Sequence, residues 1–205
     1  MVLSRKIFIN SKIINRVIWL LTLSDIFTWG LYLIINSLIG IYLSNKLGGN
    51  TIYYIGVGTG LYYLAKGGFQ IPIGVITDKL KGDKDEVIAL LLGNILMGLP
   101  YFFFPSITSP VMYYILEFIM GIGAAMNLVN WRKLFAKNLD SGKEGFDYAI
   151  YDTIMSLTMI LMSLIAGYIA SINQSYFDLV MYAIGSLMLS SGIWVISIYF
   201  YKVKK

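Results

Sequence analysis

The sequence contains neither cysteine nor histidine among its 205 residues. Without cysteine there is no disulfide framework and no thiolate site, and without either residue the usual ligands of structural zinc are missing. A Ser-His-Asp triad and a histidine general base are excluded for the same reason. No paired acidic motif such as D-x-x-D stands within an apolar stretch. We therefore expect no metal site, no cofactor and no enzymatic activity.

Charge is also scarce in this chain. Charged residues make up 13% of the sequence and hydrophobic residues 58%, whereas a soluble domain has about 25% and about 45–50% respectively. The mean hydropathy is +0.72. So few charges cannot cover a water-facing globule, and so much apolar sequence does not stay disordered. The composition therefore predicts an integral membrane protein.

Apolar stretches long enough to cross a bilayer recur along the chain, since a spanning helix needs about 20 residues. No linker between them is long enough to separate domains, so residues 1–205 are expected to form one all-α transmembrane domain. Six spans are predicted, at residues 17–43, 52–77, 87–104, 111–131, 148–170 and 177–201.

The basic residues mark one side of the predicted membrane domain. All of them except Lys46 and Lys66 precede the first span, follow the sixth, or lie between spans two and three or four and five. The positive-inside rule then places both termini in the cytoplasm, in a cytoplasmic or inner membrane. Residues 1–16 are expected to lie along the lipid surface. The net charge of +5 therefore indicates membrane lipid as a partner and no nucleic acid.

Three charged residues fall inside predicted spans: Asp25, Lys66 and Glu117. A charge in hydrocarbon is costly, so each is a candidate site residue. At 1.5 Å per residue, Asp25 lies about 13 Å beyond Arg16, and Lys66 about 18 Å before Asp78. These similar depths allow an Asp25–Lys66 contact, which would reduce the cost of both charges. A structural ion pair and a functional site both remain open.

Asp25 belongs to a polar and aromatic stripe on the first span. Thr22, Asp25, Trp29, Tyr32 and Asn36 follow spacings of three and four residues. On a helix they fall within about 80° of one another. Such a stripe is unfavourable against lipid, so it is expected to face either a cavity or hydrogen-bonding partners on another helix.

Glu117 lies seven residues after Pro110, which is about 10 Å from the outer surface. No basic residue stands near it in the sequence. Burial without a partner favours the neutral form of a carboxyl group. That property is needed at a proton-coupling site, and it also lets an inert buried glutamate persist.

Glycines form one face of the second span. Gly56, Gly60, Gly67 and Gly74 fall within about 40° on a helical wheel. Small residues on one face allow close helix packing. This face is expected to contact another helix, within the chain or across a subunit contact.

The loop after the second span carries a recognisable pattern. Residues 74–84 read G-V-I-T-D-K-L-K-G-D-K. This resembles the G-x-x-x-D-[RK]-x-G-[RK]-[RK] loop of the major facilitator superfamily (MFS), which joins the same two helices. The sequence departs from that pattern because Lys81 adds a residue before the glycine and Asp83 replaces a basic residue.

A second stretch supports the resemblance. Residues 121–125, G-I-G-A-A, resemble a segment of the family's fourth helix. The family often has arginine four residues earlier. This chain has Glu117 there, so the role of that arginine does not transfer.

The resemblance implies a fold and a way of working. Facilitators usually have two six-helix halves, each made of two inverted three-helix repeats, with the substrate between the halves. This sequence corresponds to one half, so we expect a homodimer, or pairing with a different six-helix half, and transport of a small solute by alternating access. The alternative is a heteromeric or non-transporting membrane component. The substrate is not indicated.

The resemblance also assigns roles to residues. It fits Asp25 and Glu117 facing a central pathway, and the polar stripe and the charges inside the spans add Trp29, Tyr32, Asn36 and Lys66 to the predicted pathway, with proton coupling as an option. It implies a subunit contact at Gly56, Gly60, Gly67 and Asp152. It further implies that a loop comprising Gly74, Asp78, Lys79, Gly82 and Lys84 latches one conformational state, with Asp78 near Asp152 of a second copy.

Overall fold

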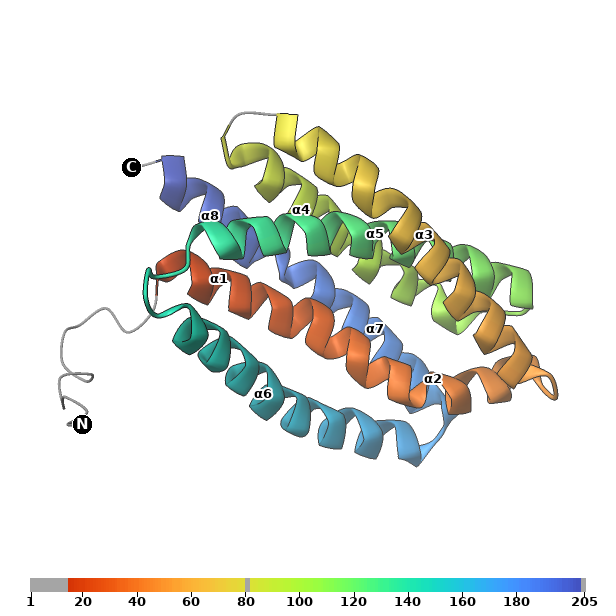
Figure 1. The fold of residues 1–205 in the computed structure, drawn as a ribbon. Coiled ribbons are helices and arrows are strands. Elements are labelled where there is room, and N and C mark those ends of the chain that lie inside the picture. Colours follow the sequence, from red (N-terminus) through yellow and green to blue (C-terminus); the bar gives the residue numbers. More distant parts are fainter. Residues whose placement is uncertain (1–14, 80–81, 204–205) are drawn as a thin grey trace, which may run out of the picture.

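The computed structural model describes residues 15–79 and 82–203, and every regular element in these ranges is a helix (Figure 1). The interfacial helix expected in residues 1–16 falls almost wholly outside the described part. The first span comprises α1 (Arg16–Asp25), a π-helical segment η1 (Ile26–Gly30) and α2 (Leu31–Leu47). The second span is α3 (Thr51–Lys79). The third comprises α4 (Lys84–Gly98) and the short 3₁₀ turns η2 (Leu99–Phe102) and η3 (Phe104–Ser106).

The remaining helices complete a bundle. They are α5 (Pro110–Lys137), α6 (Glu144–Ile172), α7 (Gln174–Ser190) and α8 (Gly192–Val203). Asn15 begins α1, where its side-chain oxygen accepts from the Val17 N–H at 2.9 Å. Ser109 caps α5, and Pro110 occupies a first-turn position whose N–H needs no helical partner.

Five of the described helical segments are long and apolar enough to cross a membrane. They are the first, third, fourth, fifth and sixth predicted spans. The second, α3, is 29 residues long but is not among them. Its many glycines and tyrosines, together with Lys66 and Gln70, lower its hydropathy. The predicted all-helical architecture is thus confirmed, and α3 is the least lipid-like of its long helices.

The bundle is arranged around α5 and the first span (Figure 1). Helix α3 packs along one side of α5 and α4 along another, while α6 packs on α1 and α2. Helices α7 and α8 lie against α4 and the first span. The core consists of two hydrophobic clusters, one around Tyr42, Tyr101 and Tyr113 and the other around Trp131 and Phe135.

Two glycines of α5 let its neighbours approach closely. A Cβ on Gly121 would lie 2.4 Å from the Tyr62 carbonyl oxygen of α3. A Cβ on Gly123 would lie 2.8 Å from the Met97 nitrogen of α4. The G-x-G spacing directs the two glycines to different helices, so this stretch brings both α3 and α4 close to α5.

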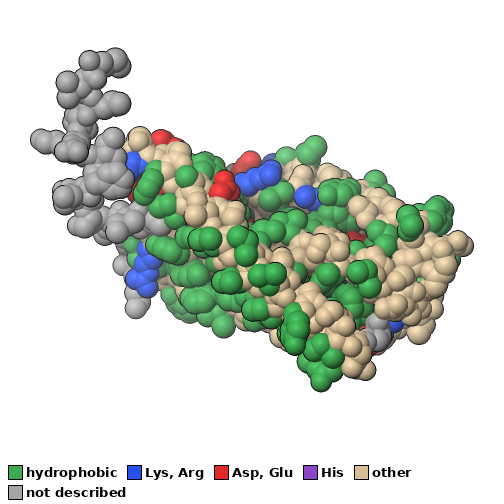
Figure 2. Space-filling view, turned by 90° about the horizontal axis from the view of Figure 1, so that it is seen from below, with side chains coloured by type: hydrophobic (Ala, Val, Ile, Leu, Met, Phe, Trp, Pro, Cys, Tyr) green, Lys and Arg blue, Asp and Glu red, His purple; other side chains and the backbone are tan. Residues whose placement is uncertain are grey.

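Helix α6 is the most exposed of the long helices. Among its residues only Asp147 and Met155 are buried, and it carries exposed Leu157, Leu161 and Leu164. Figure 2 looks onto this side of the molecule and shows many hydrophobic side chains, with most of the remaining surface formed by backbone and uncharged side chains. The charged side chains in that view gather mainly toward the end where the described chain begins. Such a face suits lipid or another apolar helix.

Candidate functional site

The polar stripe of the first span contacts three different helices rather than one. Asp25 contacts Tyr151 of α6, Trp29 contacts Asn127 of α5, and Tyr32 stacks on Tyr62 of α3 with ring centroids 5.3 Å apart. Because a π-helical turn holds one residue more than an α-helical turn, η1 changes the rotation between Asp25 and the residues after it. The expectation of one common face for the stripe assumed an uninterrupted α-helix.

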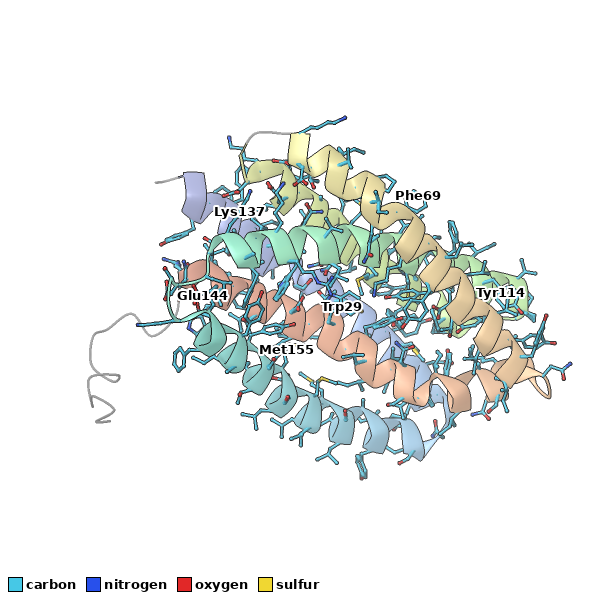
Figure 3. All side chains as sticks on the ribbon, in the orientation of Figure 1. Trp29, Phe69, Tyr114, Lys137, Glu144 and Met155 are labelled. Carbon is cyan, nitrogen blue, oxygen red and sulfur yellow. The ribbon has the colours of Figure 1, made fainter. Side chains whose placement is uncertain are left out.

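The other two members of the stripe have separate environments. The Thr22 hydroxyl donates to the Ile18 carbonyl of its own helix at 2.9 Å. Asn36 is exposed. Trp29 is labelled in Figure 3, where it lies near the middle of the bundle.

Asp25 is 2% exposed and is held by a tyrosine. Its Oδ2 accepts from the Tyr151 hydroxyl at 2.6 Å. Its Oδ1 has no hydrogen-bond partner within the described residues. A buried carboxylate oxygen without a partner is costly, and a proton or a ligand bound at Oδ1 would remove that cost.

The Asp25–Lys66 ion pair, one of the two arrangements open from the sequence, is not formed. Within the described residues Lys66 contacts aromatic rings instead. Its Nζ lies 5.0 Å from the ring centroid of Trp29, 5.6 Å from that of Tyr63 and 5.8 Å from that of Tyr62. These are cation–π distances.

Glu117 is 5% exposed and lies among tyrosines. Tyr32, Tyr101 and Tyr113 are close enough to interact electrostatically with it. No ion pair of the described chain includes Glu117. The surroundings therefore match the sequence expectation of a buried carboxyl group without a basic partner.

A buried polar network that sequence reasoning missed lies beside η1. Asn127 accepts from the Trp29 indole N–H at 2.7 Å and donates to the Asn94 side-chain oxygen at 2.6 Å. Asn94 in turn donates to the Ser191 and Ser24 hydroxyls. Thr28 donates to Ser191, which lies between α7 and α8. The two asparagines inside apolar spans could have indicated this network from the sequence, because amide side chains rarely face hydrocarbon.

The loop after α3 is tied to α4 and α5. Lys133 of α5 pairs with Asp78 at 2.8 Å and with the buried Glu86 of α4 at 2.9 Å. Lys137 pairs with Asp83 and Glu86. Asp78, one of the latch residues implied by the resemblance, therefore has a partner within its own chain.

The other latch residues surround this cluster. Gly82 has φ +109°, a conformation that favours glycine. The Lys84 Nζ lies 5.7 Å from the Tyr199 ring centroid. Lys79 is exposed at the end of α3.

A second ion-pair cluster closes the opposite end of the bundle. Lys46 pairs with Asp178 of α7 at 3.1 Å and donates to the Pro105 carbonyl at 2.8 Å. The Tyr42 hydroxyl donates to Asp178 at 2.6 Å. One ion-pair cluster thus joins separate helices at each end of the molecule.

The glycine face of α3 is largely open. No atom of the described residues lies within 4 Å of a Cβ placed on Gly56, Gly60 or Gly67, while one on Gly74 would lie 3.6 Å from Val129. The close contact of α3 with α5 uses Gly58 instead, where a Cβ would clash with the Tyr113 ring. Asp152 of α6 is exposed as well.

The comparisons with known proteins bear on the whole described domain. The sequence profile of the Major Facilitator Superfamily matches residues 18–205. No curated protein and no solved structure matches the chain at a significant level. The profile covers all the described helices except the first two residues of α1, in agreement with the resemblance of the loop at 74–84 and of the glycine pair in α5. The chain therefore belongs to the Major Facilitator Superfamily, and it is an integral membrane protein of the facilitator type of transporter.

Proposed function

We propose that the chain moves a small solute by alternating access, working together with a second six-helix unit. The observation that carries this proposal is the set of buried or half-buried charges in the spans that lack an ion-pair partner: Asp25, Lys66 and Glu117. Such charges are costly in a membrane and mark substrate or ion pathways. A purely structural bundle would pair or omit them.

We further infer that the second unit is another copy of the chain. The open glycines of α3 and the exposed apolar side of α6 support this, because both leave room for a helix of a second unit. Closed twofold pairing is the commonest arrangement of identical subunits. Helix α3 packs on α5, and α6 packs on the first span. In two inverted three-helix repeats the first span corresponds to α5 and α3 corresponds to α6, so each of these contacts is the counterpart of the other. This packing therefore also supports such repeats.

Proton coupling is part of the proposal. Asp25 and Glu117 are the carboxyl groups buried within the spans at depth, and neither has a basic partner in the described chain. A carboxyl group held in this way can alternate between neutral and charged forms as the pathway opens to one side or the other.

Cross-linking tests the dimer directly, and the natural absence of cysteine makes single-cysteine variants simple to interpret. We expect Gly67→Cys to give a covalent dimer in membranes under mild oxidation. Ile193→Cys on α8, exposed but away from α3 and α6, is the matched control. Equal cross-linking of both variants, or of neither, contradicts the homodimer.

A heteromeric or non-transporting role is the alternative. It is favoured if the purified chain stays monomeric in mild detergent at every concentration, or if it co-purifies in fixed ratio with a different six-helix protein.

A further inference from the structure

Lys66 is the charge in the bundle whose surroundings explain it least. It stands near the middle of α3, thirteen residues before the helix ends at Lys79, about 20 Å along the axis. That distance is too long for its side chain to reach the interface. A lysine held at such a depth is costly unless an opposite charge, a backbone carbonyl or water compensates it.

The ion pairs of the described chain do not include Lys66. Lys46, Lys133 and Lys137 each pair with at least one carboxylate. Lys66 instead lies over the rings of Trp29, Tyr62 and Tyr63. The rings attract its ammonium group but leave its charge uncompensated.

The nearby carboxyl groups are directed elsewhere. Asp25 accepts from Tyr151 on the α6 side, and Glu117 is enclosed by tyrosines. Neither forms an ion pair with Lys66. The compensating negative charge is therefore not supplied by the buried carboxylates of this chain.

A second cation adds to the positive charge of this region. Arg132 of α5 is exposed, has no ion pair in the described chain, and acts electrostatically on Lys66. Asp152 of α6 is an exposed carboxylate next to Tyr151. Tyr151 interacts electrostatically with both Asp152 and Arg132. Asp152 offsets Arg132 in part, but it lies on a different helix from Lys66 and forms no ion pair with it. Lys66 and Arg132 thus leave net positive charge beside exposed aromatic surface.

We propose that Lys66 binds the acidic group of the transported solute, and that the solute is an organic anion with a flat aromatic part. The ammonium group would receive the carboxylate of the solute, and Trp29 and Tyr63, the partly exposed rings beside it, would contact its apolar part. A cationic solute is disfavoured here, because it would have to displace Lys66 from these rings and approach two uncompensated positive charges. This inference rests on the proposed transport function.

The test is binding of 1-naphthoate to the purified protein in lipid nanodiscs, measured by calorimetry and by the rise in melting temperature. The probes for comparison are 1-naphthamide, which is neutral, and 1-naphthylmethylammonium, which is cationic. We expect the carboxylate to bind at least about tenfold more tightly than either, since only it can form a charge-assisted contact with Lys66. Tighter binding of the ammonium compound, or equal binding of all three, overturns the proposal.

Variants locate the site. We expect Lys66→Met to weaken naphthoate binding at least about tenfold and Lys66→Arg to retain most of it, because arginine keeps the charge. Lys143→Met, at an exposed position in the loop before α6, should bind as the natural protein does, and it corrects for partition of the probe into lipid. If Lys66→Met does not fold, naphthoate binding is compared between Tyr63→Leu and Tyr63→Phe. Only Tyr63→Leu should bind more weakly, since only the leucine variant loses the aromatic ring. Unchanged affinity in the folded Lys66→Met or Tyr63→Leu protein contradicts the assignment.

Binding and transport are separable in this design. Naphthoate that binds through Lys66 but never crosses proteoliposome membranes supports the anion site and removes the transport proposal. Transport of a cationic or neutral solute, without naphthoate binding, supports the transport proposal and removes the anion site.

Discussion

At the scale of single residues, the carboxyl groups inside the spans are distinguished by what accompanies them. Asp25 is held through one oxygen by Tyr151 and has a second oxygen without a partner. Glu117 is surrounded by tyrosine rings. In both cases the carboxyl group interacts with a tyrosine hydroxyl and not with a basic residue, so a proton can leave or arrive without breaking an ion pair.

Removing the Asp25 hydrogen bond tests its role. Tyr151→Phe is expected to lower the free energy of unfolding by about 1–3 kcal/mol, because a buried charged acceptor loses its donor. Tyr168→Phe, at an exposed position of the same helix, should change it by less than about 0.5 kcal/mol. Thermal unfolding in detergent measures both. If Tyr168→Phe lowers the free energy of unfolding as much as Tyr151→Phe does, the Tyr151–Asp25 hydrogen bond does not stabilise the fold in particular.

The carboxyl groups themselves should matter for transport more than for folding. In proteoliposomes we expect Asp25→Asn and Glu117→Gln each to abolish proton-driven uptake of the solute while the protein stays folded. Exchange of solute across the membrane without a proton gradient should persist in at least one of them. Uptake at the natural rate in both variants contradicts proton coupling.

At the scale of helices, glycine pairs decide which contacts are tight. Gly121 and Gly123 place α3 and α4 directly on α5, while a Cβ on Gly56, Gly60 or Gly67 of α3 would meet no other described residue within 4 Å. Glycine content alone does not separate these two uses. The separation depends on which direction each glycine faces once the bundle has formed.

The two kinds of glycine should respond differently to a methyl group. Gly121→Ala is expected to destabilise the monomer by about 1–3 kcal/mol, because its Cβ would overlap the backbone of α3. Gly60→Ala should leave the melting temperature of the monomer unchanged or raise it slightly, since its Cβ meets open space and alanine favours a helix over glycine. A shift in dimer dissociation for Gly60→Ala alone would place that glycine at the subunit contact. Equal destabilisation by both contradicts the packing described.

Helices were predictable from the sequence because long apolar stretches, turn residues and basic loops all indicate the same boundaries. The family could also be identified in advance from residues 74–84 and 121–125. The contacts of the polar stripe could not, because a single π-helical turn at Ile26–Gly30 changes the rotation between Asp25 and the residues of α2. The network around Asn94 and Asn127 also depends on tertiary proximity between four segments, which no local pattern encodes.

At the scale of the whole molecule, an ion-pair cluster joins separate helices at each end of the bundle. Lys46 and Asp178 join α2 to α7, and Lys133 and Lys137 join α5 to α3 and α4. Partly exposed pairs of this kind contribute little each, roughly 0–1 kcal/mol. Glu86, however, is fully buried and depends on both lysines.

We therefore expect a large loss of stability at Glu86 only when both Lys133 and Lys137 are removed. Lys133→Met or Lys137→Met alone is expected to reduce stability modestly. The double variant should cost more than the sum of the two, because a buried carboxylate is then left unpaired. A double-mutant cycle by thermal unfolding measures the coupling, and strict additivity would argue against shared support of Glu86.

The π-helical turn of the first span acts as a fixed angular offset between two stretches of one rod. The five residues Ile26–Gly30 cover about the rotation that four residues cover in an α-helix. Every residue of α2 is therefore turned by about 100° from the position that an unbroken helix would give it, and Tyr32 no longer lies on one face with Asp25. Deleting one residue between Ile26 and Gly30 should close this turn into an α-helix and leave α1 and α2 in the same mutual orientation. A chain shortened in this way should keep both its helix content and the Tyr151–Asp25 contact, whereas loss of that contact would show that the offset is set elsewhere.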